Sequence, residues 1–299
     1  MNYLVHLLIY FDIYVIVALS LNLVVGYCGM LTLAHAAYFT IGGYSYALAS
    51  LKLGLTFFPA VCVAVAIATA LSLAVSLPSW RLKGDFFVLA SLAVQALLLS
   101  TLNNWADVDA PLGTLRNLTN GPLGIPGIPK PNILGMQLTQ PASFLLLATV
   151  LATFSALILR RLKSSPWGRV LVSMREDELA VRSLGKNVKV LKIQAFAVSS
   201  GLVGIAGALY AARVGYLDPS SASLGESILM LSMVLVGGAG NFRGPLVGAF
   251  VLVALPELLR FAHLPDALAA NLRLAIYGLA LVLIMHLRPQ GISGEYRIN

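Results

Sequence analysis

Residues 3–25 read YLVHLLIYFDIYVIVALSLNLVV, an apolar stretch with a single acidic residue, Asp12, and no lysine or arginine. An α-helix needs about 20 residues to cross the roughly 30 Å hydrocarbon core of a bilayer, so this stretch is long enough to span a membrane. Further apolar stretches follow at residues 30–50, 55–78, 85–102, 141–160, 193–212, 226–238, 245–260 and 272–287. We therefore predict an all-α polytopic integral membrane protein, with about eight to ten transmembrane helices in one domain over residues 1–299.

The composition excludes a water-soluble globular protein. Of the 299 residues, 59% are hydrophobic and 11% are charged, whereas roughly a quarter of the residues of a soluble domain are charged. The mean hydropathy is +0.87. Gly (26) and Pro (14) occur at ordinary frequency and the apolar residues fall in long blocks, which excludes a disordered or fibrous chain.

Basic residues are concentrated in one loop, and this predicts the orientation of the chain. Nine of the 20 Lys and Arg residues lie between residues 160 and 192, whereas the loop at 103–140 carries only Arg116 and Lys130. Cytoplasmic loops of membrane proteins are enriched in Lys and Arg. We expect residues 161–192 in the cytoplasm and residues 103–140 outside it. Topology accounts for the net charge of +8, which therefore does not indicate nucleic acid as a partner.

The number of spans depends on residues 226–238. This stretch is too short to cross as a straight helix, and it ends in Gly237-Gly238-Ala239-Gly240. A broken or re-entrant segment at 226–240 therefore fits as well as a span. Counting spans outward from the basic loop places the N-terminus outside and the following basic residues inside: Arg81, Lys83 and Arg288.

Small residues recur at the spacing that brings helices into close contact within a membrane. Glycines stand at every fourth position from residue 240 to 248, and Gly201 and Gly204 each have a small residue four positions away. We expect these residues to pack helices within the subunit, with a dimer face or a pathway as the alternative. The glycines concerned are Gly201, Gly204, Gly240, Gly244 and Gly248.

The basic loop carries signals for two short helices outside the membrane. Ser165 followed by Pro166 is typical of a helix start. A second helix is predicted from about Asp177 to Leu184, with Gly185 where a left-handed residue would end it. One face of this second helix carries Leu179, Ala180 and Leu184. Such a face suits insertion into the groove of another protein or a hairpin lying on the membrane surface.

The sequence lacks the motifs of several chemistries. It has no G-x-x-x-x-G-K-[ST] loop, so we expect no ATP site, no ATPase activity and no cofactor in this chain. His and Cys residues do not occur at metal-ligand spacing, and no hydrolase motif is present. Any energy for transport would then come from a partner or from an ion gradient.

Ionisable residues at membrane depth are functional candidates because they are costly to bury. They are Asp12, His35, Glu226 and Glu257. Asp12 has the strongest claim to be buried. His35 lies in a segment of small residues with Gly42 and Gly43 that suits the lining of a pathway; the alternative is a buried histidine bonded to a neighbouring helix.

Taken together, these stretches resemble the permease subunits of bacterial branched-chain amino acid ABC importers of the LivM type. The resemblance covers nearly the whole chain. Two departures from the family pattern are Thr32-Leu33-Ala34 in place of Ser-x-Gly, and Asn241 where Thr or Ser is common. The resembling stretches are SLNLVVGYCGMLTLAHAAYFTIGGY (20–44), RLKGDFFVLASLA (81–93), NGPLGIPGIP (120–129), SPWGRVLVSMREDELAVRSLGKNV (165–188), KIQAFAVSSGLVGIAGALYA (192–211) and VGGAGNFRGPLVGAFVLVALPELLR (236–260).

This resemblance implies a heteromeric importer in the bacterial inner membrane. The chain would pair with a second related permease, two cytoplasmic subunits would bind ATP, and a periplasmic protein would deliver the substrate. The implied substrates are branched-chain or other hydrophobic amino acids, with urea, short amides or small carboxylates as alternatives. It implies that Asn22 joins Asp12, His35, Gly42 and Gly43 as pathway candidates, and that the following residues couple to the ATPases: Glu176, Asp177, Leu179, Ala180, Leu184 and Gly185.

Two rival classes remain, a membrane scaffold that transports nothing and an ion-coupled secondary transporter. The secondary transporter would need a site near the middle of the membrane formed by broken helices. Asp12 and His35 are the residues that would form such a site.

Overall fold

The structure is a computed structural model that describes residues 2–76, 82, 84–107, 109–133, 135–261, 272, 275, 278, 279, 282, 291 and 292. Arg81, Lys83, Arg288 and most of the predicted span at 272–287 lie outside the described residues, as does the side chain of Glu257. The described part of the chain is mainly α-helical, as the hydropathy pattern predicts.

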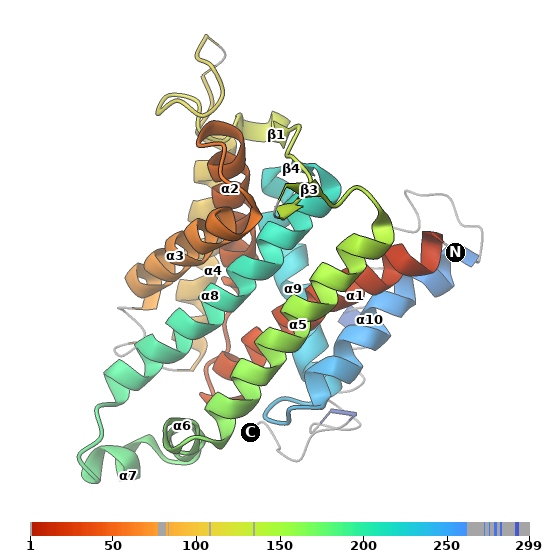
Figure 1. The fold of residues 1–299 in the computed structure, drawn as a ribbon. Coiled ribbons are helices and arrows are strands. Elements are labelled where there is room, and N and C mark those ends of the chain that lie inside the picture. The colour runs from red at the N-terminus through yellow and green to blue at the C-terminus, as the bar shows by residue number, and fades with distance from the viewer. Residues whose placement is uncertain are drawn as a thin grey trace.

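The described helices follow the apolar stretches of the sequence closely. Two short helices, α6 and α7, interrupt the series between α5 and α8 (Figure 1). The α-helices are α1 (Asn2–Asn22), α2 (His35–Lys52), α3 (Phe57–Ser76), α4 (Asp85–Asn104), α5 (Pro141–Ser164), α6 (Pro166–Glu176), α7 (Glu178–Ser183), α8 (Val188–Val214), α9 (Leu224–Gly237) and α10 (Gly244–Phe261).

Four helices of the described chain are long and apolar enough to cross a membrane: Tyr3–Tyr27, Asp85–Asn104, Pro141–Ser164 and Val188–Val214. Helices α3, α9 and α10 contain shorter apolar stretches. The protein is therefore an all-α polytopic membrane protein. At about 1.5 Å per residue, the 14 residues of α9 extend only about 21 Å, which is less than the roughly 30 Å of a bilayer core.

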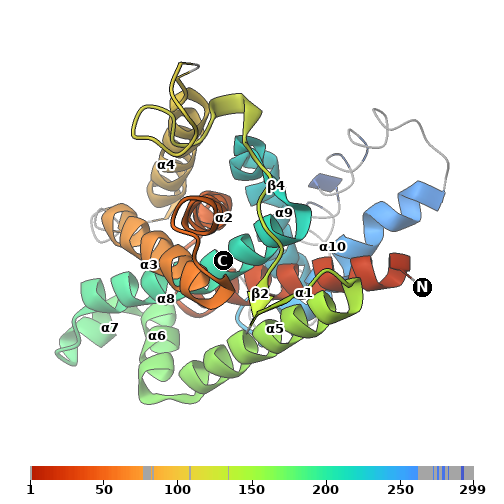
Figure 2. The ribbon, with the colours of Figure 1, turned by 45° about the horizontal axis from the view of Figure 1, so that its top comes forward.

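Helix α8 lies at the centre of the packing. It contacts α2, α3 and α1, while α5 runs alongside α1 on the other side (Figure 2). Glycines permit the closest contact: a Cβ added at Gly207 of α8 would lie 1.9 Å from the carbonyl oxygen of Phe39 and 2.9 Å from the nitrogen of Gly43. The backbones of α2 and α8 therefore touch, which is how helices gain packing energy in lipid.

The helical structure is interrupted between α1 and α2, although the hydropathy pattern predicted a helix from residue 30. Helix α1 continues as the π-helix η1 (Leu23–Tyr27), and α2 begins only at His35. Backbone groups of the intervening segment are bonded by other helices: Leu33 N donates to Ser91 Oγ at 2.9 Å, and the Ser227 hydroxyl donates to Leu33 O. Irregular backbone at membrane depth is stable only where protein supplies such partners.

The two loops that were predicted on opposite sides of the membrane lie at opposite ends of the molecule. Helices α6 and α7 are at one end, and the loop between α4 and α5 is at the other (Figure 1). That loop contains the 3-10 helix η3 (Gly121–Leu123) and the hairpin of β2 (Asn132–Ile133) with β3 (Met136–Gln137).

A short strand pair fixes this loop to the segment that follows α8. Strand β1 (Ile125–Pro126) pairs antiparallel with β4 (Tyr216–Leu217). The 3-10 helix η4 (Pro219–Ala222) then leads into α9.

Candidate functional site

Helix α6 begins as the sequence predicts. The Ser165 hydroxyl oxygen accepts a hydrogen bond from the backbone nitrogen of Gly168 at 3.2 Å, and Pro166 occupies the first helical position. A Cβ added at Gly168 would lie 2.2 Å from the carbonyl oxygen of Leu162. The close turn from α5 into α6 therefore requires glycine at this position.

Helix α7 has both predicted ends, to within one residue. At its start, Oδ1 of Asp177 accepts hydrogen bonds from the backbone nitrogens of Leu179 and Ala180 at 2.9 and 3.0 Å. At its end, Gly185 has a φ of +73°, and Lys186 N donates to Val181 O at 3.3 Å. This is the left-handed helix end that glycine favours.

The predicted apolar face of α7 is exposed. Leu179 is 68% exposed and Leu184 is 79% exposed; Ala180 between them is also exposed. Val181, in contrast, is buried. Helix α7 thus packs through one side on its own chain and leaves the other side, with two large aliphatic side chains, uncovered.

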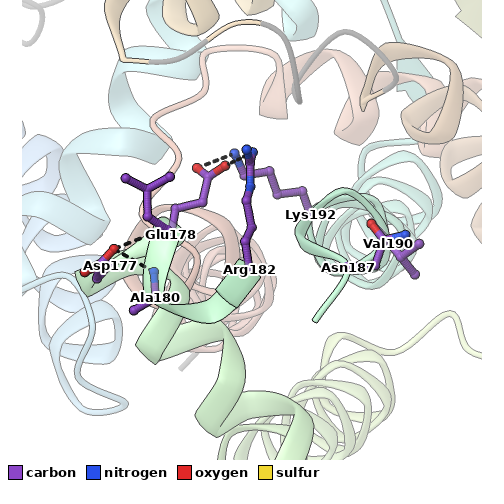
Figure 3. Close-up of polar contacts among 8 residues, drawn as sticks. Asp177, Glu178, Ala180, Arg182, Asn187, Val190 and Lys192 are labelled. Carbon is purple, nitrogen blue, oxygen red and sulfur yellow. Dashed lines mark hydrogen bonds and ion pairs between the residues drawn. The ribbon is translucent and has the colours of Figure 1, made fainter. Parts of the chain in front are cut away.

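Glu178 fastens α7 to α8, and we did not single it out from the sequence. Its Oε2 lies 3.1 Å from the ammonium nitrogen of Lys192, whose side chain is only 6% exposed. Its other oxygen pairs with Arg182 one turn along α7 (Figure 3). The Glu178–Arg182 spacing of four residues was a readable signal, whereas the bond to Lys192 depends on how α7 folds back.

Helix α6 is also fastened to α8. The indole nitrogen of Trp167 donates a hydrogen bond to Oε1 of Gln194 at 2.8 Å. On the exposed side, Glu176 pairs with Arg175 at 2.7 Å. The α6–α7 unit (residues 166–183) is therefore held to α8 at both of its helices.

Asn22 holds two parts of the chain together. Its Nδ2 donates to the carbonyl oxygen of Asn241, and its Oδ1 accepts from the backbone nitrogen of Gly240, both at 2.9 Å. The side chain is 1% exposed. Asn22 thereby connects the end of α1 with the turn between α9 and α10, and its role in a pathway stays a prediction.

Gly42 and Gly43 lie where α2 meets α8. A Cβ added at Gly42 would lie 2.6 Å from Cα of Gly204. A Cβ at Gly43 would lie 2.7 Å from a methyl group of Leu217. Both glycines therefore lie at close contacts with neighbouring segments, and their role in a pathway stays a prediction.

His35 and Asp12 have separate hydrogen-bond partners. Nε2 of the buried His35 lies 3.0 Å from Oγ of Ser20. The Ser20 hydroxyl also lies 2.8 Å from Val17 O, to which it can donate. Asp12 is half-buried and accepts from the Thr149 hydroxyl at 2.6 Å.

The other glycines of the small-residue pattern contact neighbouring helices of the same chain. A Cβ added at Gly201 would lie 3.0 Å from Oγ1 of Thr69 in α3. A Cβ at Gly248 in α10 would lie 1.8 Å from the carbonyl oxygen of Met233 in α9. In addition, Gly204 faces α3, Gly244 faces the backbone of Gly238, and Gly240 faces Arg175.

Cavities lined in part by charged side chains lie near both ends of the described part of the chain. A cavity of about 400 Å³ adjoins the α6–α7 unit, and its lining includes Cys28, Asp85, Arg175, Glu178 and Lys192. A smaller cavity of about 150 Å³ is lined by side chains that include Tyr14, Tyr210, Tyr216, Asp218 and Glu226.

The family of permease components of branched-chain amino acid transport systems matches residues 3–285. The chain belongs to this family. The permease is thus a multi-pass membrane component of an ABC transporter, in agreement with the resemblance read from its motifs. Among the solved structures, none matches it.

Curated relatives match over most of the permease. The high-affinity branched-chain amino acid transport system permease protein LivM of Escherichia coli is 32% identical over 304 residues, covering 94% of this chain and 67% of the relative. A probable branched-chain amino acid transport permease protein LivM of Methanocaldococcus jannaschii is 27% identical, covering 97% and 92%. The xylose transport system permease protein XylH of Escherichia coli is 29% identical over 33% of this chain.

Proposed function

We propose that this permease is a subunit of an ABC importer that carries branched-chain or related hydrophobic amino acids across the bacterial inner membrane. It pairs with a second related permease, two cytoplasmic subunits bind and hydrolyse ATP, and a periplasmic protein delivers the substrate. The chain itself has no ATPase site. Membership of the family supports this assignment, as do the names of the relatives that match nearly all of this chain.

The single observation that carries the coupling role is the uncovered apolar face of α7. Leu179, Ala180 and Leu184 are exposed, although the helix is capped at both ends and fastened to α8. A rigid helix with an unpartnered apolar face suits insertion into a groove of another protein. The ATPase subunits are the partners that an ABC permease needs on its cytoplasmic side.

Force on α7 would reach the membrane helices through α8. Glu178 and Lys192 connect α7 with α8 through a 3.1 Å ion pair, and α8 packs on α1, α2 and α3. The coupling residues proposed from the sequence are therefore on the outer surface of the α6–α7 unit. The Glu178–Lys192 ion pair and the packing of α8 connect that unit to the membrane helices.

Replacing Ala180 by Asp tests this coupling role. Docking would then bury an unpaired carboxylate at a cost of a few kcal/mol, and since about 1.4 kcal/mol is a factor of ten, ATPase recovery should fall at least tenfold. The measurement is co-purification of the ATPase subunits with the tagged permease, together with leucine uptake.

Ala180→Ser is the matched control, because it changes the same position without adding a charge. It should retain both the ATPases and uptake. If the Ala180→Asp permease still retains its ATPases and transports leucine normally, the proposed coupling role of α7 is wrong. Weakened contact of α7 with lipid, together with intact ATPase binding, would instead favour a hairpin on the lipid surface.

Ion-coupled secondary transport is less well supported. It would require Asp12 and His35 to act together, but each is bonded to a different hydroxyl group, Thr149 and Ser20 respectively. Uptake that survives depletion of ATP and collapses with the proton gradient would support this alternative. Competition between leucine and urea or short amides for uptake tests the substrate class.

A further inference from the structure

Arg175 is the last basic residue of α6, and its Nε and Nη2 donate hydrogen bonds to Oε1 of the neighbouring Glu176. Although the residue belongs to a loop segment outside the membrane helices, the side chain is only 10% exposed. Its Nη1 donates a hydrogen bond to the carbonyl oxygen of Gly26, 149 residues earlier in the chain. Gly26 lies in η1, the π-helical end of α1.

The side chain of Arg175 lies between two backbone segments, one at Gly29 and the other at Gly240. A Cβ added at Gly29 would lie 2.5 Å from Cγ of Arg175. A Cβ added at Gly240 would lie 2.5 Å from Nη1 of Arg175 and 3.3 Å from the carbonyl oxygen of Gly26. Glycine at positions 29 and 240 thus leaves the space that the arginine occupies.

Both segments that Arg175 touches are interruptions of membrane helices. Gly26 and Gly29 belong to the break between α1 and α2, and Gly240 belongs to the turn between α9 and α10. Asn22 joins the two segments through its bonds to Gly240 and Asn241. Single π-helical turns are frequent at functional sites. Residues in loops and at helix ends are also those that absorb backbone rotation when helices move.

We propose that Arg175 is the positioning residue that passes movement of the α6–α7 unit to these two helix breaks. This inference rests on the proposed importer function and adds a second connection, besides the one through α8, by which ATPase motion reaches the membrane helices. The guanidinium group suits the task, because its donors are held in one rigid plane. A terminal helix carbonyl such as that of Gly26 is also an acceptor that attracts positive charge.

The test measures how many substrate molecules cross the membrane per ATP hydrolysed. The complete transporter, purified through a tag on this chain and placed in vesicles with its binding protein, is assayed for leucine uptake and ATP hydrolysis. Arg175→Ala should retain its ATPases and hydrolyse ATP within about threefold of the wild-type rate, while leucine transported per ATP falls at least tenfold.

Arg169→Ala is the matched control on the same helix. Arg169 is exposed, and its guanidinium donates to Ser164 O at 3.0 Å at the adjoining end of α5. Its removal should therefore leave the number of leucine molecules transported per ATP unchanged. Arg175→Lys preserves the charge and guards against misfolding of the alanine variant. Arg175→Lys should fold, and the amount of leucine that it transports per ATP hydrolysed should lie between the values for wild type and Arg175→Ala.

Gly240→Ala provides a second, independent route to the same effect. The new methyl group would lie 2.5 Å from Nη1 and should lower the amount of leucine transported per ATP by displacing Arg175. Alanine at the φ of +82° also strains the backbone, and this cost should be seen as a lower thermal midpoint. In the double variant with Arg175→Ala, the part of the transport loss that comes from the shared contact should not be counted twice.

The outcomes separate this inference from the proposed function. A wild-type ratio in Arg175→Ala and Arg175→Lys, with ATPases bound, would overturn the role of Arg175 and leave the importer assignment standing. Equal losses in Arg169→Ala and Arg175→Ala would also overturn it. A wild-type complex without ATPase subunits would instead contradict the proposed function.

Discussion

Gly185 shows how one residue sets the geometry of the exposed helix face. Its φ of +73° ends α7, and a Cβ added there would meet nothing within 4 Å. Any cost of substitution is therefore backbone strain and not a clash. For an L-residue the left-handed region costs roughly 1–2 kcal/mol, and a β-branched side chain is poorly suited to it.

We expect Gly185→Val to weaken ATPase recovery about tenfold, because α7 loses its defined end and Leu184 its position. Gly185→Asn should retain most of the recovery, since Asn tolerates a positive φ. Both variants are compared by co-purification of the ATPase subunits with the tagged permease. Equal recovery with Val and Asn would show that the left-handed end does not matter for docking.

Residue-level signals were readable from the sequence where the contact is local. Ser165, Asp177 and Gly185 act on backbone groups within a few positions, and their roles as helix ends are confirmed. The bond from Arg175 to Gly26 joins residues 149 positions apart, so no spacing rule could reveal it.

At the scale of elements, the contact between α2 and α8 depends on the absence of side chains. A Cβ on Gly207 would lie 1.9 Å from the carbonyl oxygen of Phe39, which is rigid backbone. A Cβ on Gly201 would lie 3.0 Å from Oγ1 of Thr69, a side-chain atom that can rotate away. The two glycines of α8 therefore differ in how easily their neighbours can yield.

We expect Gly207→Ala to destabilise the permease by about 1–3 kcal/mol, the usual cost of overpacking a close contact. Gly201→Ala should cost less than about 1 kcal/mol, because only the Thr69 rotamer must change. Thermal unfolding of the two purified variants in the same detergent measures the difference. A lower midpoint for Gly201→Ala than for Gly207→Ala would contradict this account.

Element boundaries were predictable where hydropathy decides them and unpredictable where tertiary bonds do. The stretch 85–102 became α4 with nearly the same bounds, since apolar length sets a membrane helix. The stretch 30–50 is also mainly apolar, yet it is helical only from His35. Ser91 and Ser227 bond the backbone of Leu33 from two other helices, and those partners are far away in the sequence.

At the scale of the whole molecule, charge and architecture agree on two distinct ends. The α6–α7 unit and the 103–140 loop lie at opposite ends of the helix bundle (Figure 1). The basic residues gather at the former. Positive charge therefore marks the end predicted to face the cytoplasm.

Cysteine labelling tests this orientation. In a variant without the native cysteines, Cys28→Ala and Cys62→Ser, one new cysteine replaces either Leu115, which is 87% exposed, or Ser164, which is also exposed. In intact spheroplasts an impermeant maleimide should label the cysteine at 115 and not the cysteine at 164, because the positive loop stays in the cytoplasm. Permeabilised cells serve as the control, in which both positions should react. Labelling at 164 alone in intact spheroplasts would invert the topology, and α7 could then no longer meet a cytoplasmic ATPase.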